Sequence, residues 1–181
     1  RYRGRHRGGH VQDHRFDFVV GGTPDEVWDI MWTTTRRGVD TPTYRIEVLH
    51  QGDAAGNGLV RHCTFPVPRY LLSGGRGQSW EWITESVPPV SWRYDAIGKP
   101  LWSRASGWTR LEDIGEGRTR VHFRETYEAF NPVVRALLEA RVHRFISRDN
   151  DTAIEAAIVR SLERRRRRAA EAAADGQRDG S

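Results

Sequence analysis

The stretch NPVVRALLEARVHRFISRDNDTAIEAAIVRSLERRRRR, residues 131–168, determines the fold that we expect for this chain. It opens with Asn131 and Pro132, a helix N-cap followed by the residue favoured in a first helical turn, and neither glycine nor proline follows until Gly176. About 37 residues at about 1.5 Å each predict one helix of roughly 55 Å. Its apolar stripe recurs at steps of three and four residues and needs a partner surface: Val134, Leu137, Leu138, Val142, Phe145, Ile146, Ile154, Ala157 and Ile158.

Composition favours one domain with an aromatic-rich core. The chain has 181 residues, of which 37% are hydrophobic and 10% aromatic, including seven tryptophans. The single cysteine, Cys63, excludes an internal disulfide and a cysteine-based metal cluster. No apolar run approaches the length of a membrane span. These features predict a cytoplasmic protein without a transmembrane segment.

The basic charge is concentrated at the two ends. Residues 1–12 hold four arginines and no acid, and residues 163–181 hold six arginines and four acids, so the ends account for the net charge of +5. We expect residues 1–12 to be a disordered basic arm and residues 166–181 an Arg/Ala-rich tail. Two interpretations stay open: the ends are simply solvated, or they attract an anionic membrane surface, a nucleic acid or an acidic partner. For the tail, the residues concerned are Arg164, Arg165, Arg166, Arg167 and Arg168.

Between the ends, the pattern predicts a strand, a short helix and then a run of strands. Residues 14–20 alternate apolar and polar side chains, as in a half-buried strand. Thr23-Pro24-Asp25-Glu26 has the capping-box pattern of a helix start, and that helix should end near Thr33. Six further strands are expected over residues 44–51, 59–65, 78–87, 91–97, 104–114 and 119–130. The fold class is therefore α+β, with an antiparallel sheet of about seven strands covered by the long helix.

Three segments resemble the SRPBCC or START-like helix-grip superfamily: FDFVVGGTPDEVWDIM (residues 16–31), GNGLVRHCTF (56–65) and GEGRTRVHFRETYE (115–128). That superfamily includes lipid-transport domains, the birch-pollen-allergen fold and bacterial polyketide cyclases and dehydrases. The chain departs from the pattern by Arg118, inserted between Gly117 and Thr119, and by the arginine run. The resemblance implies a helix-grip domain over residues 13–165, in which a bent sheet wraps the long helix around an elongated cavity for an apolar molecule.

Aromatic residues on three successive strands are candidates for lining such a cavity. Trp80, Trp82, Trp92, Tyr94 and Trp108 share the same parity, which predicts one face of the sheet if the strands pair in register. Two interpretations remain open: ordinary core under the helix, or a pocket for a small molecule. The loop of residues 66–77 is a candidate lid, because Leu71 and Leu72 would be costly to leave in water.

Glu125 is the most specific single candidate for a polar residue of the binding site. It shares parity with Val121, Phe123 and Tyr127, so it should point inward, where a carboxylate must be paired or protonated. Arg61, Arg110 or Arg141 could pair with it. The carboxylate would then be either a structural ion pair or a polar handle for ligand, with acid–base chemistry as a further role. The predicted ligand-binding set is Trp80, Trp82, Trp92, Tyr94, Trp108, Arg110, Glu125, Tyr127 and Arg141.

Motifs for catalysis are missing from the sequence. The seven histidines have no zinc-enzyme spacing, and neither a phosphate-binding glycine loop nor a nucleophile elbow occurs, so we expect no metal and no cofactor and leave the catalytic residues unknown. Three functions remain: binding or transport of a hydrophobic small molecule such as a lipid or polyketide; a polyketide cyclase or aromatase-like enzyme; and a module that binds nucleic acid or a protein through its Arg-rich ends.

Overall fold

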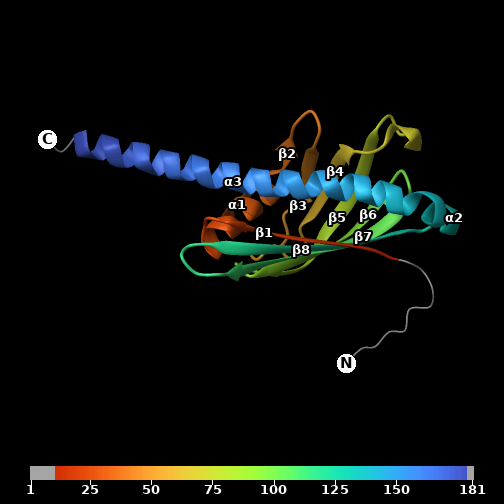
Figure 1. The fold of residues 1–181 in the computed structure, drawn as a ribbon, viewed down its shortest axis with the longest axis horizontal. Coiled ribbons are helices and arrows are strands. Elements are labelled where there is room, and N and C mark those ends of the chain that lie inside the picture. The colour runs from red at the N-terminus through yellow and green to blue at the C-terminus, as the bar shows by residue number, and fades with distance from the viewer. Residues whose placement is uncertain (1–10, 179–181) are drawn as a thin grey trace, which may run out of the picture.

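The computed structural model describes residues 11–178, which form an open antiparallel sheet of eight strands with a long helix across one face (Figure 1). The strand order is β1-β8-β7-β6-β5-β4-β3-β2, so consecutive strands pair as neighbours except that β1 closes onto β8. The strands are β1 (Gln12–Val20), β2 (Val39–Asp40), β3 (Arg45–His50), β4 (Val60–Pro66), β5 (Arg76–Val87), β6 (Ser91–Lys99), β7 (Ser103–Asp113) and β8 (Thr119–Ala129).

The α+β prediction is confirmed, with one strand more than expected. The additional strand is β2, a two-residue element that pairs Val39 with Ile46 of β3. Two residues are too few to show an alternating pattern, which is why the segment read as a connection. The predicted arm over residues 1–12 overlaps the structure at its end, because Gln12 already pairs with Tyr127; residues 1–10 lie outside the described residues.

Helix α1 (Pro24–Arg37) begins as its sequence indicates. The Thr23 hydroxyl accepts a hydrogen bond from the Glu26 N–H (3.3 Å), and the Glu26 carboxylate accepts one from the Thr23 N–H (2.8 Å). The helix runs past the expected end at Thr33, with Trp32 and Thr35 buried in its last turns, and the Thr34 hydroxyl donates to the Ile30 carbonyl (2.9 Å) within the helix. It stops at Gly38, whose φ of +76° suits glycine.

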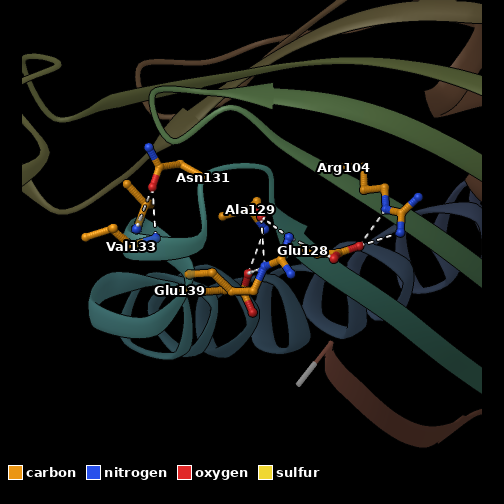
Figure 2. A network of polar contacts seen from close by, with 8 residues as sticks. Arg104, Glu128, Ala129, Asn131, Val133 and Glu139 are labelled. Atoms are coloured by element: carbon orange, nitrogen blue, oxygen red, sulfur yellow. Dashed lines mark hydrogen bonds and ion pairs between the residues drawn. The ribbon is translucent and has the colours of Figure 1, made fainter. Parts of the chain in front are cut away.

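The predicted long helix comprises three segments: α2 (Pro132–Val134), the π-helical turn η2 (Arg135–Glu139) and α3 (Ala140–Arg178). Asn131 caps the start by accepting from the N–H groups of Val133 (2.9 Å) and Val134 (3.2 Å), as Figure 2 shows for Val133. Leu162 is buried, and all side chains from residue 163 to residue 174 are exposed. Over this last part the helix projects past the sheet (Figure 1).

The π turn corrects the predicted apolar stripe. Its wider hydrogen-bond spacing shifts the helical phase, so Leu137 and Phe145 of the predicted stripe are exposed while Glu139 and His143 are buried. Arg141, predicted to face the cavity, is exposed for the same reason. Val142 is buried, as predicted. From Ile154 onward the predicted and observed buried faces agree at Ile158.

A buried acid anchors this turn to the sheet. Glu139 is fully buried, and its carboxylate accepts the N–H of Ala129 at the end of β8 (2.6 Å). Arg135 donates to the Ala129 carbonyl (2.7 Å) and pairs with Glu128, which also binds Arg104 of β7 (Figure 2). The contacts fix the start of the helix over the end of the sheet.

The opposite end of α3 is held by two members of the arginine run. Arg165 forms an ion pair with Asp29 of α1, and Arg166 donates to the Gly21 carbonyl. Between these ends, the main core packs α1 and α3 onto the sheet, with Val27, Leu59, Ile83, Val121 and Ile158 at most 3% exposed. The arginine run is therefore not wholly free for a partner.

Candidate functional site

A cavity of about 510 Å³ lies between the inner face of the sheet, which faces α3, and the two helices α1 and α3. Most of its lining is apolar, with contributions from every layer: Met31 of α1, Ile46 and Phe65 of the sheet, and Ile146 and Ile154 of α3. Among the polar side chains in and beside its lining, two hydrogen-bonded groups and a pair of histidines stand out.

The first polar group joins Tyr94 of β6 to Glu125 of β8 across the intervening strand β7. The Tyr94 hydroxyl donates to Glu125 Oε1 at 2.7 Å. The residue between them in register is Gly107, and a Cβ there would lie 2.0 Å from Tyr94 Cε1. The phenol ring can reach across β7 only because residue 107 carries no side chain.

Glu125 is accessible from the cavity but sheltered from bulk water. Burial raises the pKa of its carboxyl to about 7, against the opposing effect of the Tyr94 hydrogen bond; the negative charge of Glu81 adds to the rise. The pKa of Tyr94 is also raised, first by burial and then by the charge of Glu125. Glu125 can therefore hold or release a proton near neutral pH.

The second polar group is the ion pair of Arg61 on β4 and Glu81 on β5. Arg61 Nη2 lies 2.7 Å from Glu81 Oε2, and Ser79 donates its hydroxyl to Glu81 Oε1 at 2.7 Å. Burial is the largest single effect and lowers the Arg61 pKa, but Glu81, with smaller contributions from Cys63 and Tyr94, raises that pKa overall. The guanidinium lies 5.7 Å from the centre of the Tyr94 ring, which links the two groups.

A histidine cluster closes the cavity at the β1–α3 seam. His14 lies opposite Glu125 in the β1–β8 register, and its Nε2 is 2.8 Å from Asp151 of α3. His143 of α3 lines the cavity, with its ring 6.0 Å from that of His14 and 5.4 Å from that of Tyr127. Burial lowers the pKa of His143 to about 4, so its imidazole is uncharged at neutral pH.

The structure brings four of the nine predicted site residues to the cavity: Trp92, Tyr94, Glu125 and Tyr127. The prediction that five aromatic residues share one face is wrong. Trp80, Trp82 and Trp108 lie on the outer face, away from α3, where Trp80 stacks on His62 (4.9 Å between ring centres) and Trp108 is exposed. Arg110, opposite His122, also lies on that outer face.

Register explains these errors. A bulge at Thr84 inserts one residue into β5, so Trp82 pairs with Asp95 and Ile83 takes the place opposite Tyr94. The turn between Gly98 and Ser103 holds an even number of residues, so Tyr94 pairs with Gly107 and Trp108 pairs with Arg93. Each irregularity reverses the parity between neighbouring strands and moves a tryptophan to the other face.

The expected partner of Glu125 was an arginine, and the structure gives Tyr94 instead. Arg61 does line the cavity, but its charge is matched by Glu81, which the sequence interpretation missed together with His14 and His143. The cross-strand position of Glu81 opposite Arg61 could have been found from the β4–β5 register. The contact of His14 with Asp151, 137 residues later, had no local signal.

The loop of residues 66–77, the candidate lid, covers the cavity only in part. Val67 lines the cavity, and the loop borders a second hollow of about 440 Å³ beside Phe145 of α3. Leu72, at the tip beyond the short turn η1 (Arg69–Leu71), is exposed to solvent and does not cover the cavity.

Among the described residues, no cluster of His, Cys, Asp and Glu is arranged to hold a metal ion. Nor does any helix within residues 11–178 have the length and apolar character to cross a membrane.

No protein-family model matches the chain, and no curated protein matches it. Solved structures do. The Zhui aromatase/cyclase from Streptomyces sp. R1128 superposes with a TM-score of 0.66 at 17% identity, over 86% of this chain and 96% of that one. Ara h 8.0201 gives a TM-score of 0.62 at 16% identity, over 85% of this chain and 99% of that one. A Thermus thermophilus protein, TTHA0849, gives 0.57 at 16%, over 82% and 95%. The chain thus has the fold of the SRPBCC or START-like helix-grip superfamily, as the sequence resemblance indicates.

Proposed function

We propose that this helix-grip protein binds and carries a neutral, largely apolar small molecule in the cavity between its sheet and α3. The observation that carries the proposal is the cavity itself, whose volume of about 510 Å³ falls within the range of small-molecule sites. A protein interior is normally close-packed, and a void of this size lined by Met31, Ile46 and Ile154 is costly unless a ligand fills it.

Charge matching on the wall supports a neutral ligand. Arg61 is already paired with Glu81, and Glu125 has a pKa of about 7 with a Tyr94 hydrogen bond in place. Lys99 and Arg160 also line the cavity, but beside Tyr94 and Glu125 a charged ligand group would find no unpaired counter-charge. A hydroxyl or carbonyl group, in contrast, can exchange hydrogen bonds with Glu125, which donates when protonated and accepts when ionised.

Native mass spectrometry of the full chain purified from its own host tests the proposal, and we expect a co-purifying neutral apolar molecule. Binding of the neutral dye Nile red gives a second measurement. Ala105→Phe places a large ring on the cavity wall and should weaken dye binding about tenfold or more. Ile97→Phe, on the outer face of β6, is the matched control and should leave it unchanged. A chain that carries no ligand and binds the dye equally in both variants would contradict the proposal.

A second proposal is acid–base chemistry on the bound molecule, as in an aromatase or cyclase. It is supported by the combination of Glu125, whose pKa lies near neutral, with the uncharged imidazole of His143, since both side chains line the same cavity. Incubation with a synthetic β-polyketone distinguishes the two functions. Cyclised product that disappears in Glu125→Gln, with Nile red binding retained, would favour catalysis; binding without turnover would favour transport.

A further inference from the structure

Three connections meet at one end of the sheet, next to the start of the long helix. Because neighbouring strands are antiparallel, the β4–β5, β6–β7 and β8–α2 connections all leave from the same end of the sheet, as does the short β2–β3 connection (Figure 1). Phe130 N–H donates to the Trp102 carbonyl (2.9 Å), and Phe145 borders the hollow under the β4–β5 loop, which joins the three segments physically. We call residues 67–75, 99–102 and 130–145 the loop end.

The loop end carries the most exposed large apolar side chains of the described chain. Leu72 is 94% exposed, and the next four in order all belong to the loop end: Leu137 (67%), Val133 (62%), Trp102 (59%) and Tyr70 (56%). At the opposite end of the sheet, Leu49 near the end of β3 is 52% exposed, and Val87 and Val90 at the β5–β6 turn are 45% exposed each. Scattered apolar residues are normal on a surface, but this concentration at one end marks an interaction site.

The charges among these apolar residues have one sign. The loop end contains the cations Arg69, Lys99, Arg141 and Arg144, and also Arg135, whose charge is already matched by Glu128 of β8. Its one acid, Glu139, is fully buried against Ala129. The surface thus combines projecting leucine, tryptophan and tyrosine with a fringe of cations. Aromatic side chains favour the bilayer interface, and cations favour anionic lipid headgroups.

We propose that the loop end docks on the surface of an anionic lipid bilayer, with Leu72, Trp102 and Leu137 inserted among the headgroups. The apolar side chains project from three separate segments, as suits insertion into a deformable bilayer. The bond from the Ala129 N–H to Glu139 anchors η2 to the sheet (Figure 2). Val133 and Leu137 are already exposed beside this anchor, so docking needs no rearrangement of the helix start. Val67, Lys99 and Leu101 belong to both the loop end and the cavity wall, so the cavity would open beside the bilayer. The docking surface stands independently of the proposed ligand.

Vesicle co-sedimentation of the full chain tests this surface. We expect binding to phosphatidylcholine vesicles that contain about one third phosphatidylglycerol, and much weaker binding to phosphatidylcholine alone. Leu72→Ser/Trp102→Ser/Leu137→Ser should weaken binding about tenfold or more. The matched control, Val87→Ser/Val90→Ser at the opposite end, should bind like the wild type. All five side chains are exposed, and thermal unfolding verifies that each variant is folded.

A charge comparison separates the loop end from the arginine run. Arg141→Gln/Arg144→Gln should weaken binding about fivefold per side chain. Arg164→Gln/Arg168→Gln lies roughly 30 Å further along α3, beyond the screening length at physiological salt, and should have little effect. An unaffected triple serine variant, or greater loss in the Arg164/Arg168 variant, would overturn the proposal. So would failure to bind anionic vesicles, or a dimer of the wild type that the triple variant dissolves. Ala105→Phe should still bind vesicles, so failure of the cavity proposal is a separate result.

Discussion

Gly107→Ala should damage both the stability and the chemistry of the cavity wall. The added Cβ would lie 2.0 Å from Tyr94 Cε1 and 2.6 Å from its hydroxyl oxygen, so the phenol must leave its place across β7. Overpacking of this kind costs about 1–3 kcal/mol. The lost hydrogen bond to a carboxylate adds about 1.5–3 kcal/mol, part of which overlaps with the first term.

We therefore expect the free energy of unfolding to fall by about 3 kcal/mol, which lowers Tm by roughly 6–12 °C in a chain of this size. Urea denaturation measures the first quantity and calorimetry the second. Gly98→Ala in β6 is the matched control, because a Cβ there meets its nearest atoms at 3.4 Å. That variant should change the free energy of unfolding by less than about 1 kcal/mol. If the two alanine variants are equally mild, the crossing of Tyr94 over Gly107 is not the constraint that we describe.

Tyr94→Phe separates the hydrogen bond from the packing. The ring stays while the donor to Glu125 is removed, and that donor lowers the pKa of Glu125. The pKa of Glu125 should therefore rise above about 7 in the variant, as followed by NMR of the side-chain carboxyl. A fall in that pKa would mean that water replaces the phenol and that the cavity wall is not sheltered.

Three further predictions concern the pH dependence of stability, the Arg61–Glu81 ion pair and the outer-face residue Trp108. The raised pKa of Glu125 makes the folded chain bind more protons than the unfolded chain between about pH 4.5 and 7, so the contribution of Glu125 to stability is lost as pH rises. The lowered pKa of His143 makes the folded chain bind fewer protons between about pH 4 and 6.5, so His143 favours the folded state more as pH rises. The free energy of unfolding of Glu125→Gln minus that of the wild type should therefore increase with pH. The same difference for His143→Gln should decrease with pH, as measured by urea denaturation across this range. Arg61→Met should cost about 3–5 kcal/mol by leaving Glu81 buried and unpaired, and Arg61→Met/Glu81→Met should recover most of it; no recovery would argue against the pair. Trp108→Ala, on the outer face, should leave Nile red affinity unchanged in fluorescence titrations.

Features that depend on near neighbours in the chain were predictable from the sequence. The capping box at Thr23 and Glu26 formed as written, because both partners lie within one helical turn. The inward direction of Glu125 followed from the alternation of β8, which is regular throughout. Such patterns fix which element forms and which residues share a face within it.

Relations between elements were not predictable from the alternation within each strand, because they depend on a bulge, on the length of a turn and on a shift in helical phase. The bulge at Thr84 contains no glycine or proline that would indicate it, yet it decides whether Trp80 and Trp82 lie on the cavity face or the outer face of the sheet. The π turn at Arg135–Glu139 similarly moved Arg141 out of the buried stripe. A single inserted residue changes the face of everything beyond it, and parity within a strand cannot reveal it.

The sequence signal for the cavity lies in small residues rather than aromatic ones. The inner face of β7 reads Ser103, Ala105, Gly107 and Thr109, whereas the outer face of the same strand carries Arg104, Trp108 and Arg110. Across the cavity, Ala153, Ala157 and Ser161 recur every four residues on α3 and line its wall. Small side chains on both opposing walls leave space that the larger neighbours Phe65, Phe123 and Ile154 border but do not fill. The same lack of bulk at Gly107 lets Tyr94 reach Glu125, so the void and its polar handle arise from one feature of β7.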